Sequence, residues 1–327
     1  MVTQLSFGDR KKGGMMSSTL DLLIIGGGPA GLAAALLAGR ARLRTVVVDA
    51  DSPRNGVTKA SHGLFTRDGA SPQEIREAGK QQLEKYTTVQ YHKARIESLE
   101  RLPEGFRAST LDQAWQAKRV LVATGWKDVL ERIHLPGIQE VYGRSVFPCP
   151  FCDGFELSHK RLAIFLGDMP THMLQHYFAM VSVLSSPEFM VFTNGRTLEP
   201  ELQEALKAKN IPVVESRIAE LVSRDGILQA VHTKDGRQIA RDAGFVLDHF
   251  MVPSTHFARQ LGIAIVTDPR GLELPEAKED GSTSVPGFYL AGDARMGFGG
   301  LTIAASQGAL CVTNIIRDIA MERWHGR

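Results

Sequence analysis

The stretch Leu22-Leu23-Ile24-Ile25-Gly26-Gly27-Gly28-Pro29-Ala30-Gly31 decides how the beginning of the chain folds. Four apolar residues precede a Gly-x-Gly-x-x-Gly turn, and an Ala- and Leu-rich run follows it, which predicts a buried strand, a tight turn and a helix. The first glycine permits the turn, the second lets the backbone approach a pyrophosphate, and the third lets helix and strand pack closely. Asp49 ends the next apolar run, where a carboxylate accepts hydrogen bonds from ribose hydroxyls. The stretch therefore predicts a dinucleotide site.

The composition bounds the class of protein. The chain has 327 residues, of which 43% are hydrophobic, and its 38 basic and 36 acidic side chains nearly balance. That balance excludes a disordered chain or a coiled coil, and the net charge of +2 provides no basic field for nucleic acid or a membrane surface. The uncharged run from Leu22 to Gly39 is interrupted by glycines and proline, so we expect no membrane span.

Residues 1–18 show no apolar periodicity and lack the long apolar region of a secretory signal. We expect a disordered N-terminal extension and a cytoplasmic protein. Three cysteines cannot form a disulfide scaffold, but Cys149 and Cys152 are spaced as a pair, which in this compartment favours redox or metal chemistry.

Strand-like and helix-like segments alternate along the chain and predict an α/β fold with parallel sheets. We expect two Rossmann-like, three-layer domains, the second inserted into the first, because the last segment resembles a completion of the first unit. The expected divisions are an extension at 1–18, a first cofactor-domain segment at 19–142, an inserted module at 143–247 and a second cofactor-domain segment at 248–327. The main expected strands are 22–25, 44–48, 120–123, 162–166 and 189–192, and the main expected helices are 72–86, 171–184, 199–209 and 301–322.

Three further motifs follow the glycine turn in a fixed order: Ala123-Thr124-Gly125, Cys149-Pro150-Phe151-Cys152-Asp153-Gly154 and Ala291-Gly292-Asp293. With these four motifs the chain, from about Leu20 to Trp324, resembles the low-molecular-weight thioredoxin reductases. The resemblance implies FAD bound by a domain made of two chain segments, redox cysteines in the inserted domain, and a homodimer. It implies that Asp293 contacts the flavin ribityl chain and that the helix after Leu301 points its N-terminus at the flavin.

The expected cofactor-binding residues come from these motifs and from the Arg54–Pro72 segment, which is similar to a subgroup with degraded nicotinamide sites. This subgroup includes deeply branching bacterial thioredoxin reductases and flavin dithiol oxidases of the gliotoxin and holomycin type. His62 is interpreted either as a proton carrier near the flavin or as a structural turn residue. The full set is Gly26, Gly28, Pro29, Ala30, Gly31, Asp49, Arg54, Asn55, His62, Ala123, Thr124, Gly125, Gly292, Asp293, Thr302 and Ile303.

Cys149 and Cys152 are the expected catalytic pair, because a C-x-x-C dithiol can exchange two electrons with a flavin and with a second disulfide. The resemblance implies that Cys152 faces the flavin and Cys149 attacks the partner. Asp153 is the expected proton donor or acceptor beside them, the alternative being a solvated turn acid. A zinc site would need two more ligands at matching spacing, so no metal is expected.

The second domain departs from the resemblance. An NADPH-dependent member should show a second glycine turn after the strand 162–166 and a basic cluster after the next strand. The chain instead has Gly167-Asp168-Met169-Pro170 at the turn, a single Arg196 at the basic cluster, and Leu247-Asp248-His249 at the returning strand. These changes predict weak or absent NADPH binding.

We therefore expect an FAD enzyme that passes electrons between Cys149/Cys152 and a thioredoxin-fold partner, with a flavodoxin- or ferredoxin-type donor. Alternatives are a small-molecule dithiol oxidase that uses O2, a redox-sensing flavoprotein, and a conventional NADPH-dependent thioredoxin reductase. A further hypothesis is that Trp324-His325 folds over the flavin or the cysteine pair as a gate.

Overall fold

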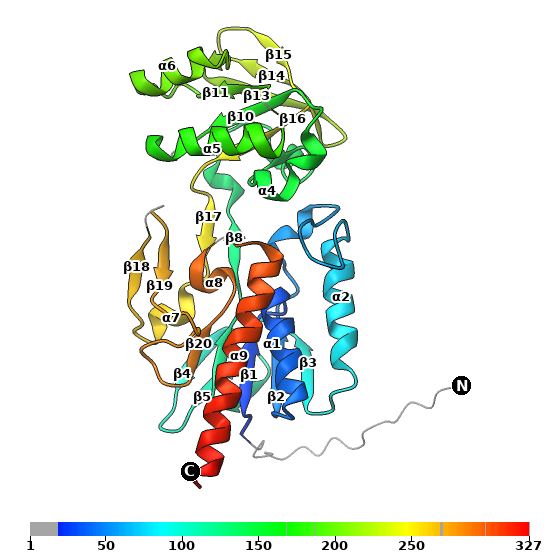
Figure 1. Ribbon diagram of the computed structural model, residues 1–327, viewed down its shortest axis with the longest axis vertical. Helices are drawn as coiled ribbons and strands as arrows, with labels where there is room; N and C mark the ends of the chain where they lie inside the picture. The colour runs from blue at the N-terminus through cyan, green and yellow to red at the C-terminus, as the bar shows by residue number, and fades with distance from the viewer. Residues whose placement is uncertain (1–18, 168, 187, 269–270, 298, 327) are drawn as a thin grey trace, which may run out of the picture.

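The computed structural model describes residues 19–167, 169–186, 188–268, 271–297 and 299–326. The expected disordered extension at 1–18 lies outside the described residues. Within these ranges the chain forms two domains, one above the other in Figure 1, which are joined by two crossing segments. No helix in the described part of the chain is long and apolar enough to cross a membrane.

The lower domain in Figure 1 is built on a five-stranded sheet in the order β20-β7-β1-β2-β3, in which all neighbouring strands are parallel. Strand β20 comes from the chain after the inserted domain and pairs with β7. The domain is therefore discontinuous, as the sequence predicts. The strands are β1 (Leu22–Ile25), β2 (Thr45–Asp49), β3 (Val89–Lys93), β7 (Val120–Val122) and β20 (Phe288–Leu290).

Each face of this sheet is covered, which explains why its strands read as continuous apolar runs. Leu22 and Ile24 of β1 pack in one core with helices α1 (Pro29–Arg40) and α9 (Gly300–Trp324). Leu23 and Ile25 point to the opposite face and pack with a three-stranded antiparallel sheet. That sheet consists of β4 (Ser98–Arg101), β5 (Phe106–Ser109) and β6 (Ala114–Ala117).

The upper domain repeats this three-layer plan around a parallel sheet in the order β12-β11-β10-β16-β9. Leu162 and Ile164 of β10 pack with helices α5 and α6, while Phe165 packs with the antiparallel sheet β13-β14-β15. The elements are β9 (Val146–Phe147), β10 (Leu162–Leu166), α5 (Thr171–Leu184), β11 (Phe189–Phe192), α6 (Pro200–Ala208), β12 (Val213–Val214), β13 (Ile218–Arg224), β14 (Ile227–Thr233), β15 (Gln238–Ala240) and β16 (Ala243–Leu247).

The chain passes between the domains through β8 (Trp126–Asp128) and β17 (Met251–Pro253), which pair antiparallel. Ile133, Leu135 and Tyr142 lie in the core of the upper domain. The inserted unit therefore starts before the expected division at 142/143, because apolar side chains ahead of β9 cover the antiparallel-sheet side of its core. The chain returns to the lower domain between β16, which ends at Leu247, and β17.

The remaining elements position the site. Helix α2 (Pro72–Leu83) has Ser71 as its N-cap, and the Ser71 hydroxyl accepts from the Glu74 amide in a capping box. The others are a 3₁₀ segment at Arg54–Val57, a second one at Leu130–Arg132, α3 (Ile138–Val141), α4 (Pro150–Asp153), a third 3₁₀ segment at Phe155–Leu157, α7 (His256–Gln260), β18 (Ile265–Thr267), β19 (Glu273–Pro275) and α8 (Asp293–Met296).

The gate hypothesis for the chain end does not fit this arrangement. Trp324 ends the long helix α9, whose first turn lies toward the upper domain and whose last turn lies at the opposite end of the lower domain (Figure 1). The Trp324 side chain is 83% exposed. Within one chain, therefore, Trp324 cannot fold over the cysteine pair.

Candidate active site

The carboxyl ends of β1, β7 and β20 meet at one edge of the lower sheet, where ligands bind in doubly wound folds. Gly26 has a φ of +108°, and a Cβ on it would lie 2.4 Å from the Ala123 carbonyl oxygen. A Cβ on Gly31 would lie 1.9 Å from the Gly26 carbonyl oxygen. These two glycines let the turn, β7 and α1 pack without side chains between them.

Gly28 differs from these two glycines because nothing lies within 4 Å of the position of its Cβ. It is the N-cap of α1, with Pro29 in the first turn, so the unpaired amides of the helix face open space. Thr124, at the end of β7, has a buried hydroxyl without a hydrogen-bond partner among the described residues. An open helix N-terminus and an orphaned buried hydroxyl fit a bound pyrophosphate cofactor.

Asp49 lies at the end of β2 beside the glycine turn, as expected, but its carboxylate is already bonded. Its Oδ2 accepts from Arg76 of α2 at 2.6 Å and from the Tyr91 hydroxyl of β3 at 2.6 Å. Burial opposes ionisation, yet the hydrogen bonds from Tyr91 and the Gly27 amide and the charge of Arg76 hold the pKa of Asp49 below its usual value. Arg76 and Tyr91 were not predicted.

Asp293 begins α8 directly after Gly292, whose φ is +67°. Its carbonyl oxygen accepts from the Trp126 indole at 2.7 Å and its Oδ1 from the Gly299 amide at 3.2 Å. Burial raises the pKa of this carboxyl, while the charge of Arg54 acts in the opposite direction. The strand-to-helix turn thus holds a buried carboxylate beside β7.

Arg54 lies at the junction of the two domains. Its guanidinium donates to Asp128 of β8 at 3.2 Å and contacts the Met251 sulfur of β17 at 3.1 Å. The hydroxyl of Tyr142, from the upper domain, donates to the same Asp128 carboxylate at 2.7 Å. Arg54 was predicted to bind the cofactor, and in the structure it also forms an ion pair that joins the 3₁₀ segment at Arg54–Val57 to the crossing strand β8.

The segment after Arg54 is folded against both domains. Asn55 lies 3.4 Å from the Ser61 hydroxyl, and Thr302 of α9 donates to the Gly63 carbonyl at 2.7 Å. The Thr302 hydroxyl, predicted to face the cofactor, therefore holds this segment in place. Ile303, its neighbour in the first turn of α9, is 46% exposed.

Cys149 and Cys152 are both free thiols at the start of α4, on the side of the upper domain that faces the lower one (Figure 1). Cys149 is 5% exposed and Cys152 is partly buried. A hydrogen bond from Cys152, together with the amides of Cys152 and Phe151, lowers the pKa of the Cys149 thiol despite its burial. The hydrogen bond to Cys149 and burial raise the pKa of Cys152. Cys149 is therefore the sulfur that ionises first.

Tyr177 of α5 is a neighbour of the pair that sequence reasoning missed. It packs in one core with Phe147 and Leu157, which flank the cysteines in the chain. Its hydroxyl is buried without a hydrogen-bond partner among the described residues, and burial together with the two cysteine sulfurs raises its pKa. Only its helical spacing was visible in the sequence, and that spacing indicates a core residue.

Asp153, the expected proton carrier, ends α4 next to Cys152. Its carboxylate accepts no hydrogen bond from any described residue, and burial raises its pKa to about 7, an effect to which Glu156 adds. The charge of His62 acts in the opposite direction. His62 lies on the lower domain, with its Nε2 3.5 Å from Glu156 Oε1 and its Nδ1 3.8 Å from Asp68 Oδ1.

The turn between β10 and α5 is filled by protein groups. Arg196 donates to the carbonyl oxygens of Gly167 at 2.9 Å and Met169 at 2.6 Å, and to the Thr171 hydroxyl at 3.0 Å. A Cβ on Gly167 would lie between 2.1 and 2.5 Å from the Asp248 carboxylate. The arginine expected to bind a phosphate is thus bonded to the turn, and a carboxylate lies against its glycine.

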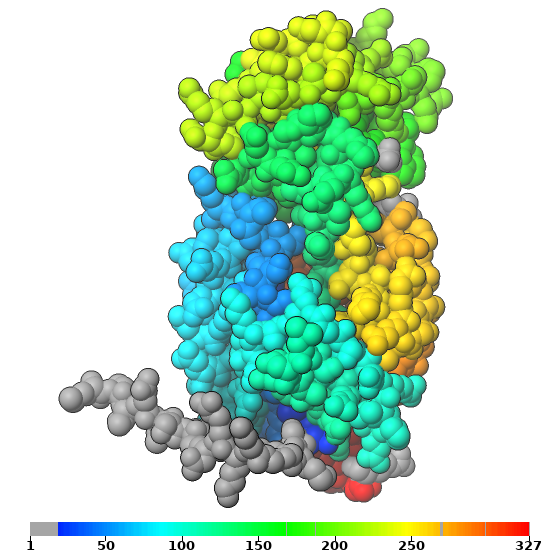
Figure 2. Space-filling view, turned by 180° about the vertical axis from the view of Figure 1, so that it is seen from behind, coloured from blue at the N-terminus to red at the C-terminus, as the bar shows by residue number. Residues whose placement is uncertain are grey.

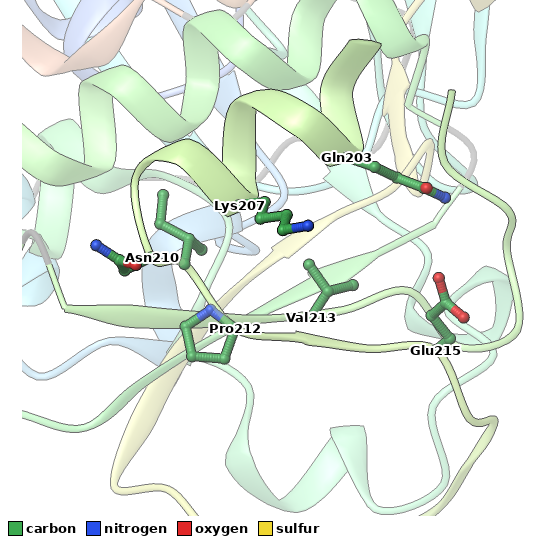
Figure 3. Close-up of a pocket in the computed structure, with 7 residues that line it drawn as sticks. Gln203, Lys207, Asn210, Pro212, Val213 and Glu215 are labelled. Atoms are coloured by element: carbon green, nitrogen blue, oxygen red, sulfur yellow. The ribbon is translucent and has the colours of Figure 1, made fainter. Parts of the chain in front are cut away.

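A separate hollow lies on the upper domain between α6 and β12 (Figure 3). Lys207 and Glu215 stand on opposite sides of it, and Pro212 and Val213 form its floor. None of the residues predicted for the functional site lines it. Its chemistry therefore adds nothing to the site at the domain junction.

Comparisons with known proteins agree with this geometry. The model of the pyridine nucleotide-disulphide oxidoreductase family matches residues 20–309. A putative thioredoxin reductase from Bacillus anthracis is 35% identical, with a TM-score of 0.85, over 93% of this chain and 99% of its own. The structure titled HlmI is 28% identical, with a TM-score of 0.86, over 96% of this chain and 97% of its own.

The thioredoxin reductase aclD of Aspergillus oryzae is 29% identical over 94% of this chain and 99% of its own length. The match to the family model covers most of the chain, including every motif of the lower domain and the cysteine pair. The chain therefore belongs to the pyridine nucleotide-disulphide oxidoreductase family and is a flavoprotein disulfide oxidoreductase of the thioredoxin reductase type, with FAD as its cofactor.

Proposed function

We propose that this protein passes two electrons between FAD, the Cys149/Cys152 pair and the disulfide of a thioredoxin-fold partner, and that NADPH is not its electron donor. The observation that carries the proposal is the difference between the two turns. The N-cap of α1 at Gly28 is open, whereas Arg196 bonds the turn residues ahead of α5 and the Asp248 carboxylate lies against Gly167. Electrons must then enter from another reductant, for which a flavodoxin- or ferredoxin-type protein is our first choice.

FAD would be held by the amides at the start of α1, by Thr124 and by Asp293. Asp49 would receive the ribose hydroxyls while it keeps its bonds to Arg76 and Tyr91. When bound, FAD supplies a two-electron redox couple. The protein would hold FAD at the edge of the sheet where the strands have their carboxyl ends. It would also bring the Cys149/Cys152 dithiol close to the cofactor.

The exchange with the partner follows from the pKa order of the two thiols. The Cys149 thiolate attacks one sulfur of the partner disulfide, which forms a mixed disulfide and releases one partner thiolate. The Cys152 thiolate then attacks the Cys149 sulfur, which releases the second partner thiolate and closes the Cys149–Cys152 disulfide. The partner gains two electrons, the pair loses two, and both partner sulfurs take up protons.

Asp153 provides one of these protons. A carboxyl whose pKa is raised to about 7 keeps its proton in about half of the molecules at pH 7 and can give it to a thiolate beside it. The other interpretation of Asp153, a solvated acid in a turn, is less compatible with the partial burial of its side chain. The same group accepts a proton when the reaction runs toward disulfide formation.

A second candidate is a dithiol oxidase, in which a small dithiol reduces the pair and O2 finally accepts the electrons. The burial of Cys149 favours it, because a protein disulfide reaches a sulfur that is 5% exposed only after the upper domain has moved. The two candidates differ in how fast the reduced holoenzyme reacts with O2 and in whether the product is a small-molecule disulfide.

The test of the proposal is the Cys149→Ser variant, for which Cys311→Ser is the matched control. Cys311 is a buried thiol in α9, distant from the pair in sequence and fold. We expect Cys149→Ser to keep FAD and to lose disulfide exchange by at least about a thousandfold, because the attacking thiolate is gone. Unchanged exchange in Cys149→Ser would refute both candidates.

A further inference from the structure

We propose that His62 relays protons between solvent and Asp153, and that this relay exists only while the two domains have the arrangement described above. The inference rests on the proposed exchange at Cys149 and Cys152. It starts from a requirement of that chemistry: the pair holds two protons when reduced and none when oxidised. Because Cys149 is 5% exposed and Asp153 is partly buried, these protons need a path to water.

His62 is the group between the buried acid and solvent. Its own side chain is 21% exposed, whereas those of Glu156 and Asp68, which its two ring nitrogens face, are 43% and 72% exposed. Glu156 and Asp68 are the described carboxylates beside the two ring nitrogens, and Asp153, three residues before Glu156 in the chain, is close enough to feel the charge of His62. Histidine is the side chain that ordinarily exchanges its proton near neutral pH, so it is suited to pass one between these carboxyls.

Hydrogen bonds hold the segment that bears His62 in place. The Gly63 amide donates to Asp68 Oδ1 at 2.8 Å, and the Gly63 carbonyl accepts from Thr302 of α9 at 2.7 Å. The segment reaches from the lower domain up to the upper one, where Figure 1 shows it beneath α4. His62 therefore belongs to one domain while Asp153 and Glu156 belong to the other.

The proton balance of the exchange is simple. When Cys149 ionises, its proton passes to Asp153 and from there through His62 to water. When the thiolate of a small dithiol leaves the pair in this arrangement, Asp153 gives it a proton and is reprotonated through His62. No net proton is gained or lost by the relay, and only the exchange of sulfur bonds changes the redox state of the pair.

The experiment follows flavin bleaching by dithiothreitol in a single turnover of the anaerobic holoenzyme between pH 5.5 and 9. We compare wild type with His62→Ala, His62→Gln and, as a matched control, His159→Gln, which changes an exposed histidine of the same domain as the cysteines. We expect His62→Ala and His62→Gln to be slower by about 100-fold at neutral pH. Added imidazole should restore much of the rate of His62→Ala but not of His62→Gln, whose side chain fills the space.

A rate and pH profile of His62→Gln equal to those of wild type would overturn the relay. Equal loss in both variants without rescue by imidazole would also overturn it, because a purely structural role predicts that result. If wild type itself does not react with dithiothreitol while its flavin is bound, the proposed exchange fails and the relay fails with it. That outcome is visible before any variant is compared.

Discussion

The two domains contain the same strand, turn and helix at their first βα junction, but the two turns leave very different space at the helix N-terminus. At Gly28, the N-cap of α1, a side chain would meet nothing within 4 Å. The first glycine of each turn is crowded in both domains, Gly26 by the Ala123 carbonyl and Gly167 by the Asp248 carboxylate. Three hydrogen bonds from Arg196 further close the second turn. Topology thus provides two equivalent places for a dinucleotide, and the side chains around each turn decide which place is usable.

Figure 2 shows how the two domains meet at the surface of the molecule. The upper domain sits on the lower one as a separate lobe, and the early segment between β2 and α2 rises from the lower domain to meet it. The same domain places Cys149, Cys152 and Asp153 toward the lower one. Its remaining role in our account is to position the dithiol and its acid.

The largest expected effect comes from placing the same side chain at each turn. Gly28→Val fills open space at a residue whose φ is −77°, so we expect the apoprotein to keep its stability within about 0.5 kcal/mol while the variant no longer binds stoichiometric FAD. Gly167→Val should do the reverse, keeping FAD and losing about 1 to 3 kcal/mol through overpacking against Asp248.

Flavin absorbance per protein and urea unfolding of both variants measure these two effects separately. Retained flavin in Gly28→Val would refute the cofactor placement. An undisturbed free energy of unfolding in Gly167→Val would show that the second turn has more room than the structure gives it.

The comparison extends to the buried carboxyl of each domain. Asp293 in the lower domain accepts from the Gly299 amide and feels the charge of Arg54, whereas Asp153 in the upper domain accepts no hydrogen bond from the described residues. With its pKa raised to about 7, folded Asp153 binds a proton that the unfolded chain has already lost above about pH 4. The free energy of unfolding should therefore fall as pH rises from 4 to 7.

Asp153→Asn removes the carboxyl whose ionisation destabilises the folded state at high pH. We therefore expect the variant to be more stable than wild type at pH 8 by up to about 4 kcal/mol, and equal to it at pH 4. The exposed Asp112→Asn serves as control. Urea unfolding at the two pH values measures the difference. A gain of the same size at pH 4 would contradict the burial argument, because the carboxyl is neutral there in both states.

The smallest expected effect comes from replacing Arg196, the side chain that bonds the residues of the second turn. Arg196→Met keeps most of the volume and removes three hydrogen bonds, so we expect the free energy of unfolding to fall by about 1 to 2 kcal/mol. We also expect no gain of NADPH binding, because Asp248 still lies against Gly167. Exposed Arg132→Met is the control for urea unfolding, and titration calorimetry reports NADPH binding. Tight NADPH binding by Arg196→Met would mean that the arginine alone closes the turn.

Much of the fold was predictable because its signals are local. The apolar run at 22–25 and the glycines after it fix β1 and the start of α1, and the helix 171–184 was predicted with the bounds that the structure shows. The parallel sheets and the insertion follow from the alternation of strands and helices. The expected domain boundary after residue 142 was less accurate, because nothing in the sequence of the apolar residues before β9 indicates which domain core they join.

The site was predictable only where one motif contains the whole feature. The cysteine pair and the open glycine turn are of this kind. The hydrogen bonds of Asp49 to Arg76 and Tyr91 join residues that are 27 and 42 positions apart in the sequence. No local sequence pattern shows that the elements carrying them lie side by side. The pairing of His62 with Glu156 depends on how two domains meet, so it could be found only in three dimensions.

We propose above all that the flavin exchanges electrons with the cysteine pair and that no nicotinamide bound at the second dinucleotide turn reduces it. An anaerobic stopped-flow titration of the holoenzyme with NADPH, NADH and a reduced thioredoxin-type dithiol, followed by flavin absorbance, tests it most directly. The account predicts that the nicotinamides leave the flavin oxidised, while the dithiol bleaches it in wild type but not in Cys149→Ser. Rapid bleaching by NADPH would contradict the account, because it would show that the turn filled by Arg196 and Asp248 still admits the nucleotide.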